Sequence, residues 1–183
     1  MTSSASVSGD ERLRLFLALR IPDDVLDEIA RWQRDQLAAV RAVPREHLHV
    51  TLAFLGHRPP GELAAIVGAL RAAAAGAGEM RLRPVRYRET RSVGMLVLED
   101  DGGRAACLAG DLQERLERLG VYRREGRRWL PHLTVARWRE RPRLRLEPPP
   151  VRTFVPSDVA AYLSRLHPGG ARYEVLESVA LGG

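Results

Sequence analysis

The sequence predicts an α+β fold in which two similar halves each supply a mostly antiparallel sheet. Two observations support this prediction. The order strand, amphipathic helix, strand occurs twice along the 183 residues, and the two units begin about 80 residues apart. The last strand of each unit carries a histidine and a threonine separated by one apolar residue. We therefore expect a duplicated, bilobed protein with helices on the outer faces of the sheets and a groove in the centre.

The first unit begins with residues 13–22, LRLFLALRIP, which predict a strand that ends at a proline. Residues 23–40 start with acidic residues and continue with helical periodicity, which predicts an amphipathic helix. Its apolar stripe contains Val25, Ile29, Trp32 and Leu37. Residues 47–56, HLHVTLAFLG, predict a strand that a glycine ends. A helix over residues 61–76 and a strand over residues 80–90 follow.

The second unit repeats this order. Residues 94–100, GMLVLED, predict a strand, and residues 102–120 predict a helix. The apolar face of this helix contains Ala105, Leu108, Leu112, Leu116 and Leu119. Residues 129–138, WLPHLTVARW, close the unit as a strand, and the proline-rich residues 146–156 predict a stiff connection. Residues 158–181 surround the turn sequence HPGG, which predicts a hairpin.

Domain organisation and compartment follow from length and composition. Residues 12–183 are expected to form one bilobed domain after a disordered polar tail over residues 1–11. No apolar run is long enough to cross a bilayer, and the N-terminus lacks the regions of a signal peptide. We therefore expect a cytoplasmic protein without membrane contact. Because the duplication lies within one chain, a monomer is expected to suffice.

The residue types present exclude several kinds of chemistry. The chain has 29 basic residues, all of them arginine, and its net charge of +6 indicates an anionic partner such as nucleic acid. Without a lysine it cannot be a P-loop nucleotidase, a Schiff-base enzyme or a ligase that adenylates its own lysine. The single cysteine, Cys107, excludes an intrachain disulfide and cysteine-rich zinc sites. We expect Cys107 to be a small core residue of its helix.

The two His-x-Thr motifs are the main functional signal. Because side chains alternate along a strand, His49 and Thr51 share one face, and His132 and Thr134 share the equivalent face of the second unit. The apolar residues between and after them are expected to point into the core: Val50, Leu52, Leu133 and Val135. If the two faces meet across the groove, two imidazoles and two hydroxyls surround one cavity.

Such a cavity suits in-line displacement at a phosphodiester. A neutral histidine accepts a proton from the attacking oxygen, and a protonated histidine donates one to the leaving oxygen. The threonine hydroxyls can donate hydrogen bonds to the non-bridging oxygens. This chemistry needs no metal and no other cofactor. As an alternative, His47 and His49 form a His-x-His pair that could bind zinc, although no third ligand stands at a recognisable spacing. His57 and His167 lie beside turn residues and are expected to be exposed.

These motifs and their flanks resemble the 2H phosphoesterase superfamily. They resemble more closely the bacterial RNA 2′,3′-cyclic phosphodiesterases, historically called 2′-5′ RNA ligases. The resemblance rests on RLFLAL, HLHVTLAFLG, PHLTVAR and YLSRLHPGGARYEVLESVAL, in that order along the chain. It implies hydrolysis of a terminal 2′,3′-cyclic phosphate to a 2′-phosphate, with RNA ends or small cyclic nucleotides as substrates. It also implies reversible 2′-5′ ligation.

The resemblance further implies roles for the motif residues. His132 would be the base that activates water, and His49 would be the acid that protonates the leaving 3′-oxygen. Thr51 and Thr134 would hold the phosphate.

Two further residues are implied as substrate contacts. Arg137 stands where the family's second motif usually continues to arginine, and it would contact phosphate or base. Five positions after His132, it would face away on a flat strand, so a bulge or twist is needed. Phe16 is a candidate stacking surface for a base, with core packing as the competing interpretation. The chain departs from the family in the strand over residues 94–100, which has no tryptophan, and in Trp138 after the arginine.

Two interpretations without catalysis compete with the enzyme. One is a nucleotide-binding module that kept the groove and lost turnover, and the other is a basic RNA-binding protein whose motifs are structural. Binding alone does not require two acid–base histidines, and aromatic residues make up only 5% of the chain, which argues against an interleaved aromatic–basic RNA surface. A bell-shaped pH profile carried by two histidines would separate the enzyme from both.

Overall fold

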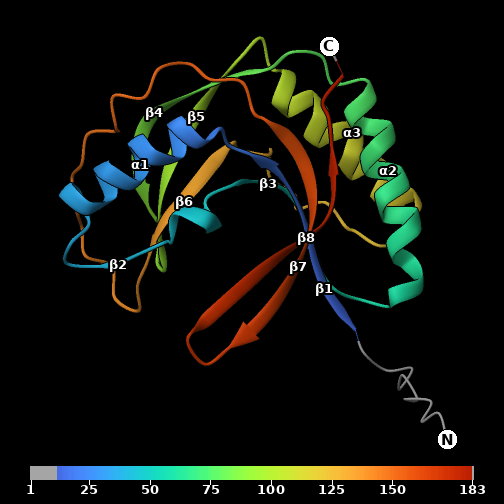
Figure 1. Cartoon of the computed structure of the whole chain (residues 1–183), viewed down its shortest axis with the longest axis horizontal. Coiled ribbons are helices and arrows are strands. Elements are labelled where there is room, and N and C mark those ends of the chain that lie inside the picture. The colour runs from blue at the N-terminus through green and yellow to red at the C-terminus, as the bar shows by residue number, and fades with distance from the viewer. Residues whose placement is uncertain (1–11, 183) are drawn as a thin grey trace, which may run out of the picture.

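The computed structural model describes residues 12–182, and the predicted tail over residues 1–11 lies outside them. Figure 1 shows the chain with its elements in order. The strands are β1 (Leu13–Arg20), β2 (Arg41–Ala42), β3 (Val50–Arg58), β4 (Arg81–Glu89), β5 (Val93–Asp101), β6 (His132–Arg137), β7 (Asp158–His167) and β8 (Gly170–Val179). The helices are α1 (Asp23–Gln36), α2 (Leu63–Ala75) and α3 (Arg104–Arg118), with short 3₁₀ turns η1 (Arg45–His47) and η2 (Pro60–Glu62).

The strands form two four-stranded antiparallel sheets. The first sheet has the order β3-β1-β7-β8, and the second has the order β2-β6-β5-β4. All pairs of neighbouring strands run antiparallel. The two motif strands, β3 and β6, therefore belong to different sheets, and β7 and β8 form the predicted hairpin. The predicted α+β class with two antiparallel sheets is confirmed.

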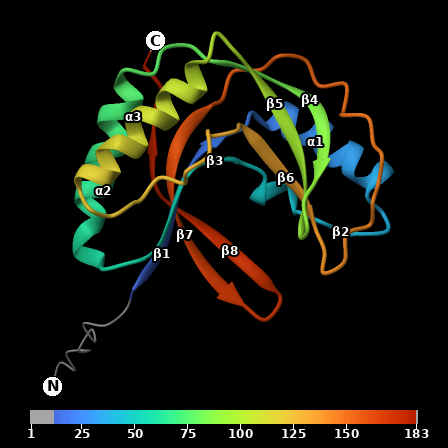
Figure 2. The ribbon, with the colours of Figure 1, turned by 180° about the vertical axis from the view of Figure 1, so that it is seen from behind.

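Each half of the chain places a helix against the sheet of the other half. Between β1 and β3 of the first sheet the chain forms α1, whose Trp32 ring lies 6.0 Å from the ring of Tyr87 on β4 of the second sheet. Between β5 and β6 of the second sheet the chain forms α3, whose Gln113 donates a hydrogen bond to the Leu52 carbonyl of β3. Figures 1 and 2 show α1 beside β4, β5 and β6, with α2 and α3 together on the other side of the molecule.

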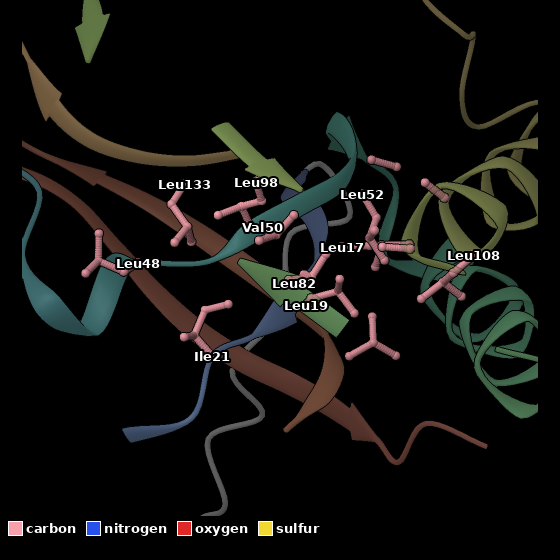
Figure 3. Close-up of a cluster of buried hydrophobic side chains, with 14 of the residues drawn as sticks. Leu17, Leu19, Ile21, Leu48, Val50, Leu52, Leu82, Leu98, Leu108 and Leu133 are labelled. Atoms are coloured by element: carbon pink, nitrogen blue, oxygen red, sulfur yellow. The ribbon is translucent and has the colours of Figure 1, made fainter. Parts of the chain in front are cut away.

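The main core lies behind the motif strands and joins both sheets. Figure 3 shows side chains of β1 and β3 meeting those of the second sheet and of α3, and the labelled residues include Leu17, Leu19, Val50, Leu52, Leu82, Leu98, Leu108 and Leu133. Each large apolar side chain that is fully buried contributes roughly 1.5–3 kcal/mol relative to an exposed one. Val50 and Leu133 are almost completely buried, at 1% and 0% exposure, so the motif residues beside them face away from this core.

The structure corrects several predicted details. The predicted strand over residues 47–56 begins only at Val50, because the chain first makes the η1 turn after Pro44. The helix predicted over residues 23–40 ends at Gln36, and the two-residue strand β2 was not predicted. Cys107 lies on α3 as expected, but its side chain is exposed, so its predicted place in the core is wrong. No helix among residues 12–182 is long and apolar enough to cross a membrane.

Trp138 packs where β5 has a glycine. A Cβ atom at Gly94 would lie 2.7 Å from Tyr87 Oη and 2.8 Å from Trp138 Cη2. We expect Gly94→Ala to lower the free energy of unfolding by about 1–3 kcal/mol, because it overpacks this contact. Denaturant unfolding would measure this. Gly110→Ala on α3 is the control, since its Cβ meets nothing within 4 Å, and it should stabilise by roughly 0.5–1 kcal/mol. Equal effects of both substitutions would contradict the packing assigned to Trp138.

Candidate active site

A cavity of about 250 Å³ brings the two motifs together. His49 and Thr51 line it from the β3 side, and His132 and Thr134 line it from β6, together with Arg137. The other lining residues come from β2 and the segment after it and from the hairpin of β7 and β8: Arg41, Ala42, Val43, Pro44, His47, Gly169, Gly170, Ala171 and Tyr173. The structure thus places five of the six residues predicted to act on substrate around one space.

His132 is held by the main chain immediately before its strand. It is the first residue of β6, and its Nδ1 lies 2.8 Å from the carbonyl oxygen of Leu130. A carbonyl can only accept, so this contact places a proton on Nδ1. In the neutral ring Nε2 is then the free acceptor, available for proton transfer in the cavity.

His49 occupies the equivalent position immediately before β3. Its ring makes a hydrogen bond to the main chain of His47, two residues earlier, as the His132 ring does with Leu130. The Phe16 ring stacks beneath it with a centroid distance of 4.8 Å and an interplanar angle of 28°. The rings of Tyr162 and Tyr173 lie 5.9 and 5.6 Å away. His49 is therefore enclosed by aromatic rings apart from the side that faces the cavity.

This environment keeps His49 neutral at neutral pH. Burial lowers its pKa from the ordinary value of 6.5 to about 4. The hydrogen bond to the main chain of His47 raises the pKa, while the positive charges of His47, Arg137 and His132 lower it further. His132 and Arg137 thus act electrostatically on His49 across the cavity. A neutral imidazole beside a second histidine is what a proton acceptor and donor pair requires.

Phe16 supports His49 and does not line the cavity. It is only 3% exposed, and it stacks on Tyr162 on β7 at 4.8 Å as well as on His49. With so little exposed surface, the Phe16 ring has no free face on which a base could stack. The competing interpretation of core packing therefore describes Phe16 better. Tyr173 on β8 is the partly exposed aromatic residue of the cavity wall.

Arg137 reaches the cavity through a β-bulge. Thr134 and Ala136 pair with successive residues of β5, so Val135 between them is an extra residue on β6. Val135 and Ala136 are both buried, and the alternation of the strand shifts by one position. Arg137 therefore lies on the same side as His132. Its sequence position predicts a bulge or twist, and the structure has a bulge.

The first motif has the same bulge. Thr51 and Ala53 pair with successive residues of β1, so Leu52 is the extra residue on β3. The position equivalent to Arg137 is then occupied by Phe54, which is 47% exposed and lies beneath the Arg14 guanidinium at 4.6 Å. The two motifs share their backbone geometry, but only the second one adds a positive charge to the cavity.

Buried glutamines hold both bulges. Gln33 on α1 donates from Nε2 to the Val135 carbonyl at 2.8 Å, and Gln113 on α3 donates from Nε2 to the Leu52 carbonyl at 2.8 Å. Both acceptors are the extra residues of the bulges. The Val135 carbonyl also accepts a hydrogen bond from the Val43 N–H at 2.9 Å. The helices that cross to the opposite sheet thus fix the backbone next to each motif threonine.

Replacing Gln113 by leucine should destabilise the protein. The substitution leaves the buried Leu52 carbonyl without its side-chain donor, which costs about 1–3 kcal/mol of unfolding free energy. Denaturant unfolding checks this against Gln36→Leu, which introduces the same side chain at an exposed position of α1. If both variants were equally stable, the glutamine would not hold the bulge.

The zinc alternative lacks a ligand set. The His47 ring in η1 lies 4.4 Å from the Tyr173 ring, tilted by 43°. Within residues 12–182, no three His, Cys, Asp or Glu side chains are grouped so that they could hold a metal ion. The two remaining histidines, His57 and His167, are exposed as predicted.

Sequence reasoning missed four residues around the site. Gln33 and Gln113 could have been found, because each lies four residues after an apolar residue of its helix stripe, Ile29 or Ala109, where a polar residue is unusual. Arg41 and Tyr173 carried no such signal. They reach the cavity only because β2 and β8 are placed there by the sheets.

Comparisons with known proteins agree with this geometry. A family model described as the 2′-5′ RNA ligase superfamily matches residues 21–166. The chain is similar to an RNA 2′,3′-cyclic phosphodiesterase of Methanocaldococcus jannaschii, with 24% identity over 182 residues that cover 90% of this chain and 99% of that protein.

Solved structures show the same fold. A crystal structure of E. coli LigT with 3′-AMP superposes with a TM-score of 0.81 and 24% identity, covering 94% of this chain and all of that one. The crystal structure of TT0787 from Thermus thermophilus superposes with a TM-score of 0.80 and 29% identity, covering 93% and 99% of the two chains. Since the family model covers most of the chain, the chain belongs to the 2′-5′ RNA ligase superfamily.

Proposed function

We propose that this protein is a cyclic phosphodiesterase that hydrolyses a 2′,3′-cyclic phosphate at an RNA end to a 2′-phosphate, using two histidines and no metal. The observation that carries the proposal is the single cavity lined by His49, Thr51, His132 and Thr134. Membership of the superfamily and the likeness to the M. jannaschii phosphodiesterase support the same activity. Both motifs come from one chain, so a monomer would be sufficient.

The proposed reaction is an in-line displacement at phosphorus. A water molecule attacks the phosphorus while a neutral histidine takes its proton, and the new P–O bond forms as the P–O3′ bond breaks. The protonated histidine gives its proton to O3′, so the phosphate stays on O2′. Hydroxyl groups of Thr51 and Thr134 donate to the non-bridging oxygens, where negative charge grows. With a 5′-hydroxyl in place of water, the same displacement would form a 2′-5′ linkage, and attack of O3′ on that linkage would reverse it.

A substrate with a changed leaving group can show which histidine is the acid and which is the base. The resemblance assigns His49 as the acid, whereas its pKa of about 4 makes it neutral in the free protein and better suited to act as the base. A cyclic phosphate with sulfur in place of O3′ has a leaving group that needs no proton. This substrate should rescue the variant that lacks the acid, His49→Ala or His132→Ala, and leave the other variant inactive.

The activity itself is tested on an RNA oligonucleotide that ends in a 2′,3′-cyclic phosphate, in excess EDTA. Conversion to a product with the phosphate on O2′ is expected. Activity that EDTA abolishes would contradict the metal-independent mechanism. Tight binding without turnover would contradict the enzyme and favour a nucleotide- or RNA-binding module on the same fold.

A further inference from the structure

The segment immediately before β6 connects the two motifs. The indole Nε1 of Trp129 donates a hydrogen bond to the carbonyl of Thr51, the threonine of the first motif, at 3.0 Å. Trp129 lies three residues before His132, the histidine of the second motif. In the first sheet β3 is an edge strand with β1 as its neighbour, so a side chain and not a further strand supplies this donor. The main chain of one motif is thus bound to the segment that leads into the other.

Trp129 is anchored by its ring as well as by its N–H. Residues 123–128 before it are exposed, whereas Trp129 is only partly exposed because its ring packs against the main core. A phenylalanine could also place an aromatic ring there. What the tryptophan adds is the indole N–H, a donor that cannot accept, and this donor is directed at Thr51.

The Leu130 carbonyl, which orients the His132 ring, is held from both sides. After it, the Pro131 carbonyl accepts a hydrogen bond from the Leu98 N–H of β5 at 2.9 Å. Before it, Trp129 is bound to the first motif. Proline has a fixed φ angle and restricts the residue before it to extended conformations, so this short segment is stiff. The orientation of His132 therefore depends on one anchor in each sheet.

We propose that Trp129 is a positioning residue for the proposed reaction and holds the His132 ring in a fixed place relative to the Thr51 hydroxyl across the cavity. Both groups act on the same phosphate, since the histidine transfers a proton and the hydroxyl donates to a non-bridging oxygen. Misplacing such a group by about 1 Å can lower a rate by about 10²-fold. The inference rests on the proposed function and extends its machinery to a residue that does not line the cavity.

Trp129→Phe tests this role, because it keeps an aromatic ring and removes the donor. The substrate is an RNA oligonucleotide that ends in a 2′,3′-cyclic phosphate. We expect kcat to fall by about 3- to 10-fold, the range given by one lost hydrogen bond, with KM within about twofold of the wild-type value. The KM is preserved because every residue that lines the cavity is retained.

Trp32→Phe is the matched control. The Trp32 Nε1 on α1 donates to the Glu147 carbonyl at the same distance of 3.0 Å, and neither residue lines the cavity. This variant loses the same kind of hydrogen bond, so denaturant unfolding should show a similar loss of stability, while kcat should stay at the wild-type value. Equal kcat in the two variants, or a change confined to KM, would overturn the positioning role and leave the proposed function standing.

The ¹⁵N shifts of the His132 ring give a second measurement that does not depend on turnover. At about pH 9, where imidazoles are neutral, the wild-type ring should carry its proton on Nδ1, which donates to the Leu130 carbonyl. Trp129→Phe should raise the share of rings with the proton on Nε2, and Trp32→Phe should not. A wild-type proton on Nε2, or the same tautomer in wild type and Trp129→Phe, would overturn the positioning role. A wild-type protein that leaves the oligonucleotide intact would instead overturn the proposed function.

Discussion

Alanine at His49 or at His132 is expected to lower kcat/KM for a terminal 2′,3′-cyclic phosphate by about 10²- to 10⁴-fold, because each variant loses one of the two proton transfers. The kcat/KM of the double variant should be little lower than that of the less active single variant, since the two groups act as a unit on one phosphorus. Steady-state hydrolysis of a cyclic-phosphate oligonucleotide in EDTA measures all three.

His57→Ala is the matched control for this experiment. His57 lies on β3 like the first motif, but its side chain is exposed and does not line the cavity. This control variant should retain wild-type turnover and stability. If only one of the two substitutions lowered kcat/KM, catalysis by an acid–base pair would be contradicted, and the reaction would need a mechanism with a single histidine.

His49 should also make the folded protein sensitive to acid. Its pKa is about 4 when folded and 6.5 in the unfolded chain, so between these values the unfolded state binds a proton that the folded state does not. Stability is therefore unaffected by His49 above pH 6.5 and falls as the pH drops towards 4. At 1.36 kcal/mol per pKa unit, the loss amounts to about 3 kcal/mol.

Denaturant unfolding of the wild type and His49→Gln across this pH range isolates the contribution. The difference in unfolding free energy between the two proteins should change by about 3 kcal/mol from pH 7 to pH 4, in favour of the variant at the acidic end. His57→Gln removes an exposed histidine from β3, the strand that follows His49, and should keep the wild-type pH dependence. A pH-independent difference for His49→Gln would show that the ring is not held in its neutral form.

The sequence was sufficient to predict the elements and the pairing of the motifs. Apolar periodicity located every long strand and helix, and alternation placed Val50 and Leu133 in the core with His49 and His132 on the opposite face. Counting residues along the strand also predicted a bulge or twist before Arg137, and the structure has a bulge there. The elements, the strand faces and the bulge are local features, so single chain segments specify them. The meeting of the two motifs followed from the internal duplication.

Features that depend on distant segments were not predictable. An apolar stripe shows that α1 is buried on one side but not which sheet it covers, so the exchange of helices between the halves appeared only in the structure. The sequence alone could not decide between base stacking and core packing for Phe16, because its burial depends on Tyr162, which is far away in sequence. Arg41 stood among 29 arginines, and only the short strand β2 sets it opposite Arg137.

The pH dependence of kcat/KM tests the central claim most directly, because it counts the protons on the two histidines in the free protein. We expect a bell-shaped profile whose acidic limb falls near pH 4, where His49 becomes protonated and the pair loses its acceptor. The alkaline limb should appear where the pair loses its last proton. Tryptophan fluorescence would confirm that the protein stays folded during the assay. A profile that stays flat through pH 4, or one with a single limb, would contradict catalysis by one neutral and one protonated histidine.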